Sequence, residues 1–289
     1  MNVCAIKYAL YTLYIQYKHA IYTLYTLGKY CVYCRKCSFM ARQKGIITLV
    51  GTLEGINFYS RKGVAVARKA GGGFTSKAIK NKPSMQRVRE NSSEFGRCST
   101  VKKEFRLALL PFLLDVRDGS LHGLMMRLFQ QIKTLDIVNT RGARTVAQGM
   151  TTAMGRKLLK DFDFTPSCNV QQLLGGNANF DWITYHYTVT DFEIQQVSLP
   201  KGATHVSVQL GLLCFDFLTF ESTLYKSDAF FMNSDFTDTT FTLDLTEAPT
   251  AAGVQIAVLG LRFYQEVEGE LYVFNGERTV GLEVLGVVS

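Results

Sequence analysis

Histidine, proline and tryptophan are scarce in this chain of 289 residues, which has 4, 5 and 1 of them. The low proline content, with 24 glycines, excludes collagen-like or proline-rich material. No histidine lies in a His-Glu-x-x-His or other metal-binding spacing. A Gly-x-Ser-x-Gly nucleophile elbow, a Gly-x-Gly-x-x-Gly motif and a P-loop are also missing. We therefore predict a non-enzymatic protein with no catalytic residue, no metal ligand and no cofactor.

Long apolar runs are equally scarce. Residues 40–289 contain no uncharged apolar stretch of the roughly 18 residues that a membrane-spanning helix needs. Hydrophobic residues make up 47% of the chain and charged residues 19%, which is typical of globular proteins. We predict a cytoplasmic protein, with membrane association only if residues 1–39 are genuine.

Residues 1–39 differ from the rest of the sequence. They contain no acidic residue and repeat the unit Tyr-Thr-Leu-Tyr, which is a low-complexity signal. We predict a non-native upstream extension, with Met40 as the true start. The alternatives are a disordered segment, a membrane-associated segment, for which Lys18 is costly, and a signal peptide, for which a cleavage site is missing. Cys31-x-x-Cys34-x-x-Cys37 lacks the fourth ligand of a structural zinc site.

Charge is divided unevenly along the chain. Residues 1–39 carry a net charge of +5, residues 40–165 carry +14 and residues 166–289 carry −11. Such a division is typical of a module that binds nucleic acid or another polyanion. Attraction between opposite-charge halves, within one chain or between copies, explains it equally well, so a homo-oligomer stays open.

Residues 40–165 are predicted to form a β-meander followed by a small helical module. The expected strands are 46–50, 56–59 and 64–67, joined by turns at Glu54-Gly55 and Lys62-Gly63. Apolar residues at helical spacing predict helices from a Ser84 cap to Pro111, over 121–135, and from Thr145 to Lys160. We interpret Gly71-Gly72-Gly73 as a flexible joint, because no Gly-Lys-Ser or Gly-Lys-Thr follows it.

Basic residues in this half are the candidate contacts to phosphate. Short arginine-bearing loops and helix starts reach phosphate groups well. No zinc finger, ribonucleoprotein strand motif or heptad zipper supports the assignment, so solvated surface charge remains the alternative. The candidate nucleic-acid-binding residues are Arg61, Lys62, Arg87, Arg89, Arg97, Arg141 and Arg144.

Residues 166–289 alternate apolar and polar side chains, which predicts an antiparallel β-sandwich. The fold class is therefore α+β. The expected strands are 185–187, 192–197, 206–212, 214–220, 241–245, 254–258, 261–267, 271–274 and 280–284. Glu266, Glu268 and Glu270 flank a predicted turn, where we expect a solvated face in place of a pair of glycosidase carboxylates. Cys98, Cys168 and Cys214 are isolated, which indicates buried or free thiols in a reducing compartment.

Several segments together resemble an uncharacterised family of bacterial proteins. The likeness covers most of residues 40–289 and implies bacterial origin and a shared architecture, with no activity and no functional residue. The segments are Lys44–Ile47, Gly51-Thr52, Phe58-Tyr59, Ile79–Pro83, Gln86–Arg97, Pro200–His205 and Phe263–Val267.

These observations predict three segments: the extension 1–39, a basic module over 40–165 and an acidic sandwich over 166–289. The first functional hypothesis is a binding protein whose basic half contacts nucleic acid and whose sandwich mediates recognition or assembly. The second is a self-assembling structural protein of a phage-like or surface assembly. The third is a sandwich that binds or hydrolyses carbohydrate.

Overall fold

The computed structural model describes residues 40–43, 48–70, 75–116, 119–276 and 278–289. It has helices and antiparallel sheets, which confirms the α+β class. Its contacts divide the chain between Ser76 and Lys77 into two compact units, here called the N-terminal and C-terminal units. Among the described residues, no helix has the length and apolarity needed to cross a bilayer. The predictions made for residues 1–39 lie outside the described residues.

The described residues of the N-terminal unit form a four-stranded antiparallel sheet with the strand order β1-β4-β3-β2. The strands are β1 (Met40–Arg42), β2 (Gly51–Leu53), β3 (Ile56–Arg61) and β4 (Val64–Lys69). Two-residue turns at Glu54-Gly55 and Lys62-Gly63 join the last three strands, as predicted. All four turn residues have positive φ, which Asn-Gly-type hairpin turns require and glycine adopts without strain. Thr48–Val50 are not in a strand, and β1 was not predicted.

The helices of the C-terminal unit follow the predicted apolar periodicity. The helical segments are α2 (Ser76–Asn81), η2 (Pro83–Met85), α3 (Gln86–Ala108), α4 (Leu110–Leu113), α5 (Leu121–Thr134), α6 (Val146–Met150), α7 (Ala153–Lys160), α8 (Val170–Leu174) and η3 (Ile194–Gln196). Thr145 caps α6 as predicted, because its side chain accepts a hydrogen bond from the Gln148 N–H. Ser84 does not cap α3: it lies inside the short turn η2, and Met85 takes the cap position.

In the part of this unit that the structure describes, nine strands form two antiparallel sheets. The strands are β5 (Asn177–Phe180), β6 (Tyr187–Thr190), β7 (His205–Phe215), β8 (Ser222–Lys226), β9 (Phe230–Asn233), β10 (Phe241–Leu243), β11 (Val254–Val267), β12 (Glu270–Val273) and β13 (Val280–Val288). Strands β10, β6 and β5 make a small sheet. The six others make a curled sheet built on the long central pair β7 and β11.

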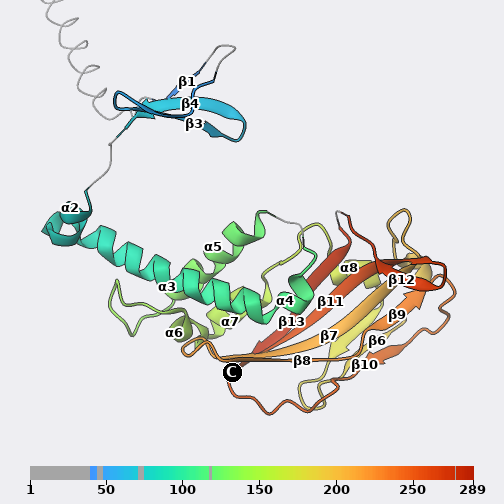
Figure 1. Ribbon diagram of the computed structural model, residues 1–289. Helices are drawn as coiled ribbons and strands as arrows, with labels where there is room; N and C mark the ends of the chain where they lie inside the picture. The colour runs from blue at the N-terminus through green and yellow to red at the C-terminus, as the bar shows by residue number, and fades with distance from the viewer. Residues whose placement is uncertain (1–39, 44–47, 71–74, 117–118, 277) are drawn as a thin grey trace, which may run out of the picture. The chain divides into compact units, whose positions relative to one another are not determined.

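The curled sheet has a hydrophobic core on each face. On one face, apolar residues of β7, β11 and β13 pack with helices α3–α7 in a single cluster. On the other face, the same strands pack against the small sheet, so the two sheets form a sandwich. Figure 1 shows the helices grouped over one end of the curled sheet.

The shared core moves the boundary between the compact units. The sequence predicted a boundary near residue 166, where charge and periodicity both change. The structure instead joins the helices of residues 86–160 to the strands that follow, because their apolar stripes are buried against β7, β11 and β13. The basic helices and the acidic sheets therefore belong to one compact unit, and the division lies at Ser76/Lys77.

Two glycines allow the helical layer to approach the sheet. Gly211 of β7 and Gly260 of β11 lie beneath the ring of Phe112 in α4. A Cβ at Gly211 would lie 2.7 Å from that ring, and one at Gly260 would overlap it. Arg262 fixes α4 nearby, with its Nη2 donating to the Pro111 carbonyl at 2.6 Å. On this face of the curled sheet the helical layer thus ends at α4, and the sheet continues beyond α4.

Some strand predictions are wrong for identifiable reasons. Residues 192–197 alternate apolar and polar side chains, yet Ile194–Gln196 form a short helical turn in which Ile194 is buried. Strand β7 ends at Phe215, because the Asp216 carboxylate accepts hydrogen bonds from the Leu218 and Thr219 N–H groups and makes a turn. Strands predicted at 254–258 and 261–267 are one continuous strand, β11.

Candidate polyanion-binding surface

Strand register places three arginines and a tyrosine on one face of the N-terminal sheet. Asn57, Tyr59 and Arg61 lie on the same face of β3, because side chains alternate along a strand. Register brings Asn57 opposite Arg68, Tyr59 opposite Val66, and Val66 opposite Arg42. The basic face therefore consists of Arg42, Thr52, Asn57, Tyr59, Arg61, Val64, Val66 and Arg68.

The charged side chains of the basic face are exposed to solvent. Arg42, Arg61 and Arg68 are all exposed, and Tyr59 is half-buried beside them. The Arg68 guanidinium carbon lies 5.6 Å from the centroid of the Tyr59 ring, within the range of a cation–π contact. The face therefore combines solvent-accessible positive charge with an aromatic ring.

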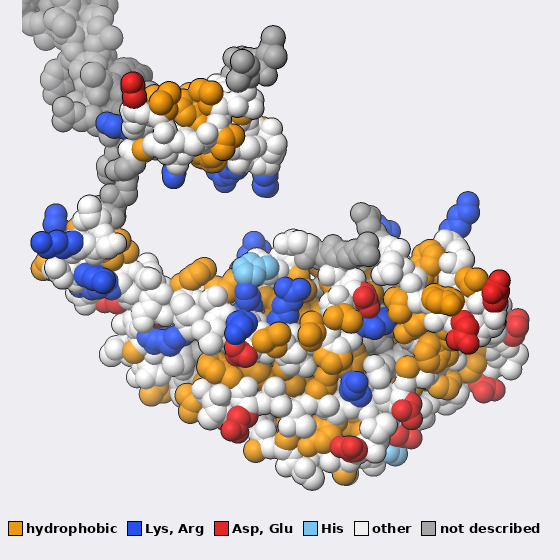
Figure 2. Space-filling model, in the orientation of Figure 1, with side chains coloured by type: hydrophobic (Ala, Val, Ile, Leu, Met, Phe, Trp, Pro, Cys, Tyr) orange, Lys and Arg blue, Asp and Glu red, His pale blue; other side chains and the backbone are white. Residues whose placement is uncertain are grey.

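The reverse side of this sheet is mostly apolar, with Lys69 opposite Ile56 and Ser60 opposite Ala65. Leu53, Ile56 and Phe58 share it with the alanines of β1 and β4. Figure 2 shows hydrophobic side chains gathered on one side of this small sheet and Lys and Arg side chains on the other. The two faces thus differ in chemistry, so the arginines are not an even scatter of surface charge.

The arginines of α3 are used differently from those of the sheet. Arg89 is half-buried and donates from Nη1 to the carbonyls of Ile79, at 2.7 Å, and Lys82, at 3.0 Å. Arg97 donates to the Ser93 hydroxyl at 2.8 Å and to the Gly142 carbonyl. Both side chains therefore hold neighbouring backbone in place. Arg87, in contrast, is exposed, and its side chain has no hydrogen bond or ion pair in the part of the chain that the structure describes.

A buried carboxylate accounts for Arg144. Glu94 of α3 is 1% exposed. It accepts two hydrogen bonds from Arg144, at 2.8 and 3.0 Å, and one from Lys133 at 2.6 Å. Its Oε1 also accepts the Gly142 N–H at 2.7 Å. The Arg144 hydrogen bonds are the main cause that lowers the pKa of Glu94 to about 2, against the opposing effect of burial.

A second buried carboxylate fixes the start of the same loop. Asp136 is 3% exposed and accepts hydrogen bonds from the N–H groups of Val138, Asn139 and Thr145. Burial alone would raise the pKa of Asp136, but the hydrogen bonds from Asn139 and Thr145 outweigh it and lower the pKa. Arg141 completes the loop with an ion pair to Glu90 at 3.3 Å and stays 44% exposed. The loop 136–145 is therefore held rigidly to α3.

The seven predicted contact residues thus separate into two groups. Arg61, Lys62 and Arg87 are exposed, and Arg141 is partly so. In the remaining three, Arg89, Arg97 and Arg144, the guanidinium groups donate hydrogen bonds to other residues of the chain. Sequence reasoning did not include Arg42 and Arg68 among the contacts. In the sequence, both arginines lie in segments that alternate with apolar residues. Pairing these segments with the same alternation in β3 could have placed the arginines on the face of Tyr59 and Arg61.

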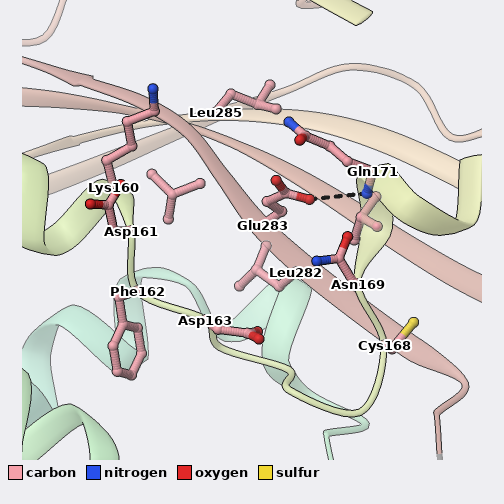
Figure 3. Close-up of a pocket in the computed structure, with 12 residues that line it drawn as sticks. Lys160, Asp161, Phe162, Asp163, Cys168, Asn169, Gln171, Leu282, Glu283 and Leu285 are labelled. Carbon is pink, nitrogen blue, oxygen red and sulfur yellow. Dashed lines mark hydrogen bonds between the residues drawn. The ribbon is translucent and has the colours of Figure 1, made fainter. Parts of the chain in front are cut away.

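The C-terminal unit has a polar cavity of about 430 Å³ between the end of α7 and the start of α8. Figure 3 shows Glu283 at its centre, with Lys160 and Asp161 on one side and Gln171 on the other. Glu283 accepts a hydrogen bond from the Gln171 N–H at 3.1 Å, and burial raises its pKa. Within the described ranges, no three His, Cys, Asp or Glu side chains are grouped as metal ligands.

The three described cysteines are free and buried, as predicted. Burial raises the pKa of Cys98 and of Cys168 to about 11, so both thiols stay protonated at neutral pH. Cys168 lines the cavity of Figure 3, but because its thiol stays protonated it does not provide a nucleophile there.

The sheet face beyond α4 carries a second group of accessible side chains. Phe231 of β9 contacts Tyr264 of β11 edge to face at 5.2 Å, and Phe231 is 42% exposed. His205 lies 3.8 Å from the carboxylate of Glu266. Glu266, Glu268 and Glu270 are all exposed around the predicted turn, where Glu268 and Gly269 have positive φ. This arrangement is an apolar patch with an acidic rim.

Comparisons with known proteins add no relative: no protein-family model, no curated protein and no solved structure matches this chain. The resemblance to the bacterial family therefore stays a prediction.

Proposed function

We propose that this protein binds nucleic acid through the basic face of its N-terminal sheet, in a binding role without catalysis and in the cytoplasm. The observation that supports the proposal is the placement of Arg42, Arg61 and Arg68 on one face, all exposed. Arginine presents a planar fork of donors that matches phosphate oxygens. Clustered arginines also release counterions from a nucleic-acid backbone, which favours binding at low salt.

Exposed basic residues outside the face extend the proposal. Lys62 lies in the turn between β3 and β4, next to Arg61. Arg87, at the start of α3, is a further contact that belongs to the C-terminal unit. Arg89, Arg97 and Arg144 are left out of the proposed contacts, because a donor that already serves a buried carboxylate or carbonyl gains little by leaving it.

The test is a salt titration of binding to DNA and RNA with the full chain. The variant Arg42→Ser/Arg61→Ser/Arg68→Ser should weaken binding. It should also make the slope of log affinity against log salt less steep by about 2 to 3, because each lost phosphate contact contributes roughly 0.9 on duplex DNA and 0.7 on a single strand.

The matched control is Arg127→Ser/Lys157→Ser/Lys201→Ser, which removes the same charge from exposed positions elsewhere. This variant should retain the wild-type slope. Equal losses in both variants would show that net charge alone attracts the nucleic acid, and no loss in the first would exclude the basic face.

A second candidate function is self-assembly, which the patch beyond α4 favours. Phe231 and Leu271 are exposed there, and Glu266 pairs with Leu271 on the same face. Exposed apolar patches with a polar rim mark interaction sites. We propose a second copy as the alternative partner, because residues 40–76 carry a net charge of +5, opposite to the rim.

Light scattering of the full chain at low and high salt tests this alternative. Self-association that weakens with salt and is lost in Phe231→Ser/Leu271→Ser would support it. Ile183→Ser/Leu218→Ser is the control, since these side chains are 88% and 72% exposed elsewhere in the same unit. A monomer at all salt concentrations would exclude it.

A further inference from the structure

Tyr59 occupies the middle of the basic face. Arg61 lies two residues along the same strand, on the same side of the sheet. Across the sheet, Tyr59 pairs with Val66 of β4, which pairs in turn with Arg42 of β1. The guanidinium of Arg68 lies over the tyrosine ring. An aromatic ring therefore shares one face of the sheet with arginines from three strands.

We infer that the basic face takes single-stranded nucleic acid, with one base stacked on Tyr59 and the flanking phosphates held by the arginines. This inference rests on the proposed function and specifies its ligand. Proteins that bind single strands combine a basic surface, which follows the backbone, with aromatic side chains on which bases stack. The basic face supplies both parts in the described residues of one small sheet.

A duplex cannot use the tyrosine. Its bases are stacked on one another, and a protein reaches their edges through grooves that admit a helix or a two-stranded ribbon. A sheet of four short strands presents a broader surface, which would meet only the phosphates of a duplex. In single strands the base faces are accessible, so the ring contributes to binding there and nowhere else.

Polar groups on the same face suit unpaired bases. Asn57 lies two residues before Tyr59 on β3, and Thr52 of β2 pairs with it in register. Their side-chain oxygens are 3.5 Å apart, and the Asn57 amide offers both a donor and an acceptor to a base edge. The face thus holds stacking, hydrogen-bonding and phosphate-binding groups side by side.

The test compares Tyr59→Leu with Phe58→Leu in the full chain. Tyr59→Leu should lower affinity for a single-stranded oligonucleotide by about 5- to 150-fold, the usual effect of losing one stacked base. Phe58→Leu should have no such effect, because Phe58 lies on the apolar reverse side. Tyr59→Phe should retain the affinity, since it keeps the ring.

Duplex DNA and heparin are the ligands that separate the two proposals. Heparin is a polyanion without bases, so Tyr59→Leu should bind it as the wild type does, which also shows that the basic face is still folded. Equal losses on heparin and on the oligonucleotide would overturn the stacking inference and leave polyanion binding intact. If the triple arginine variant binds every ligand unchanged, the proposed function itself fails.

Discussion

Some arginines of the C-terminal unit are used in the opposite way to those of the N-terminal sheet. On the N-terminal sheet, Arg42, Arg61 and Arg68 stand on an exposed face and have no acidic partner among the described residues. On α3 and the loop 136–145, Arg97 and Arg144 are turned inward to a carbonyl and a buried carboxylate. The basic residues therefore fall into two groups: those available to a ligand and those needed to stabilise the fold.

The difference depends on whether a buried acceptor lies within reach. Glu94 is almost fully buried, and a carboxylate in that position is tolerated only when donors surround it. Arg144 and Lys133 supply those donors and are thereby withdrawn from the surface. The N-terminal sheet buries no acid among its described residues, so its arginines have no such role.

The largest expected effect comes from removing the buried acceptor. Glu94→Gln leaves Arg144 and Lys133 without their charge partner, and breaking a buried ion pair in this way typically costs about 3–5 kcal/mol. The free energy of unfolding, measured by urea titration monitored by circular dichroism, should fall by that amount. The triple arginine variant of the basic face should change it by less than about 0.5 kcal/mol. Similar losses in the two variants would remove the distinction.

Acid should reproduce part of this loss without a mutation. The pKa of Glu94 is lowered from 4.5 to about 2 in the folded chain, so the folded state favours the ionised form. Its contribution to stability is complete above about pH 5 and is lost as the pH falls towards 2, by roughly 3 kcal/mol. Urea titrations between pH 5 and 2 should show a shallower pH dependence for Glu94→Gln than for the wild type. Identical pH dependences would mean that other carboxylates carry the effect.

A single arginine of each kind gives a smaller contrast. Arg144→Ala removes two hydrogen bonds to Glu94 and leaves Lys133 in place, so we expect a loss of about 2–3 kcal/mol. Arg61→Ala should change stability by less than about 0.5 kcal/mol. In the salt titration the order should reverse, with Arg61→Ala alone flattening the slope. Weakened binding by folded Arg144→Ala would return that residue to the contact surface.

How much of this was predictable depends on the range of the interactions. The helices and hairpin turns follow from local patterns, such as the apolar stripe of 121–135 and the glycines after Glu54 and Lys62. The shared core of helices and sheets was not predictable from charge, because burial of apolar stripes decides it. The pairing of Arg144 with Glu94 was not predictable for a similar reason, since the two residues are 50 positions apart in the sequence.

Strand register was the other missing information. Arg42 and Arg61 are far apart in the sequence, and only the pairing of β1 with β4 and of β4 with β3 places them on one face. A shift of one residue in either pairing would move a whole strand's side chains to the opposite side. Composition could therefore suggest a basic surface in this part of the chain, but it could not predict which residues lie together on one face.

The finest contrast lies between two arginines on one helix. Arg87 and Arg89 are two residues apart in α3, so they point away from each other. Arg89 holds the carbonyls of Ile79 and Lys82, whereas Arg87 is exposed. We expect Arg89→Ala to lower stability by about 1 kcal/mol and to leave the salt slope unchanged. Arg87→Ala should leave stability unchanged and flatten the slope by about 0.7 to 0.9.

Urea titration and salt titration of the same two variants measure both effects. The pair is a stringent test because local sequence, charge and helical context are nearly identical, and only the contacts differ. If both variants lose stability and neither changes the slope, α3 takes no part in binding, and the basic face of the N-terminal sheet carries the phosphate contacts alone. If Arg89→Ala flattens the slope as much as Arg87→Ala, then internal hydrogen bonds do not withdraw an arginine from binding, and the division between the two kinds of arginine fails.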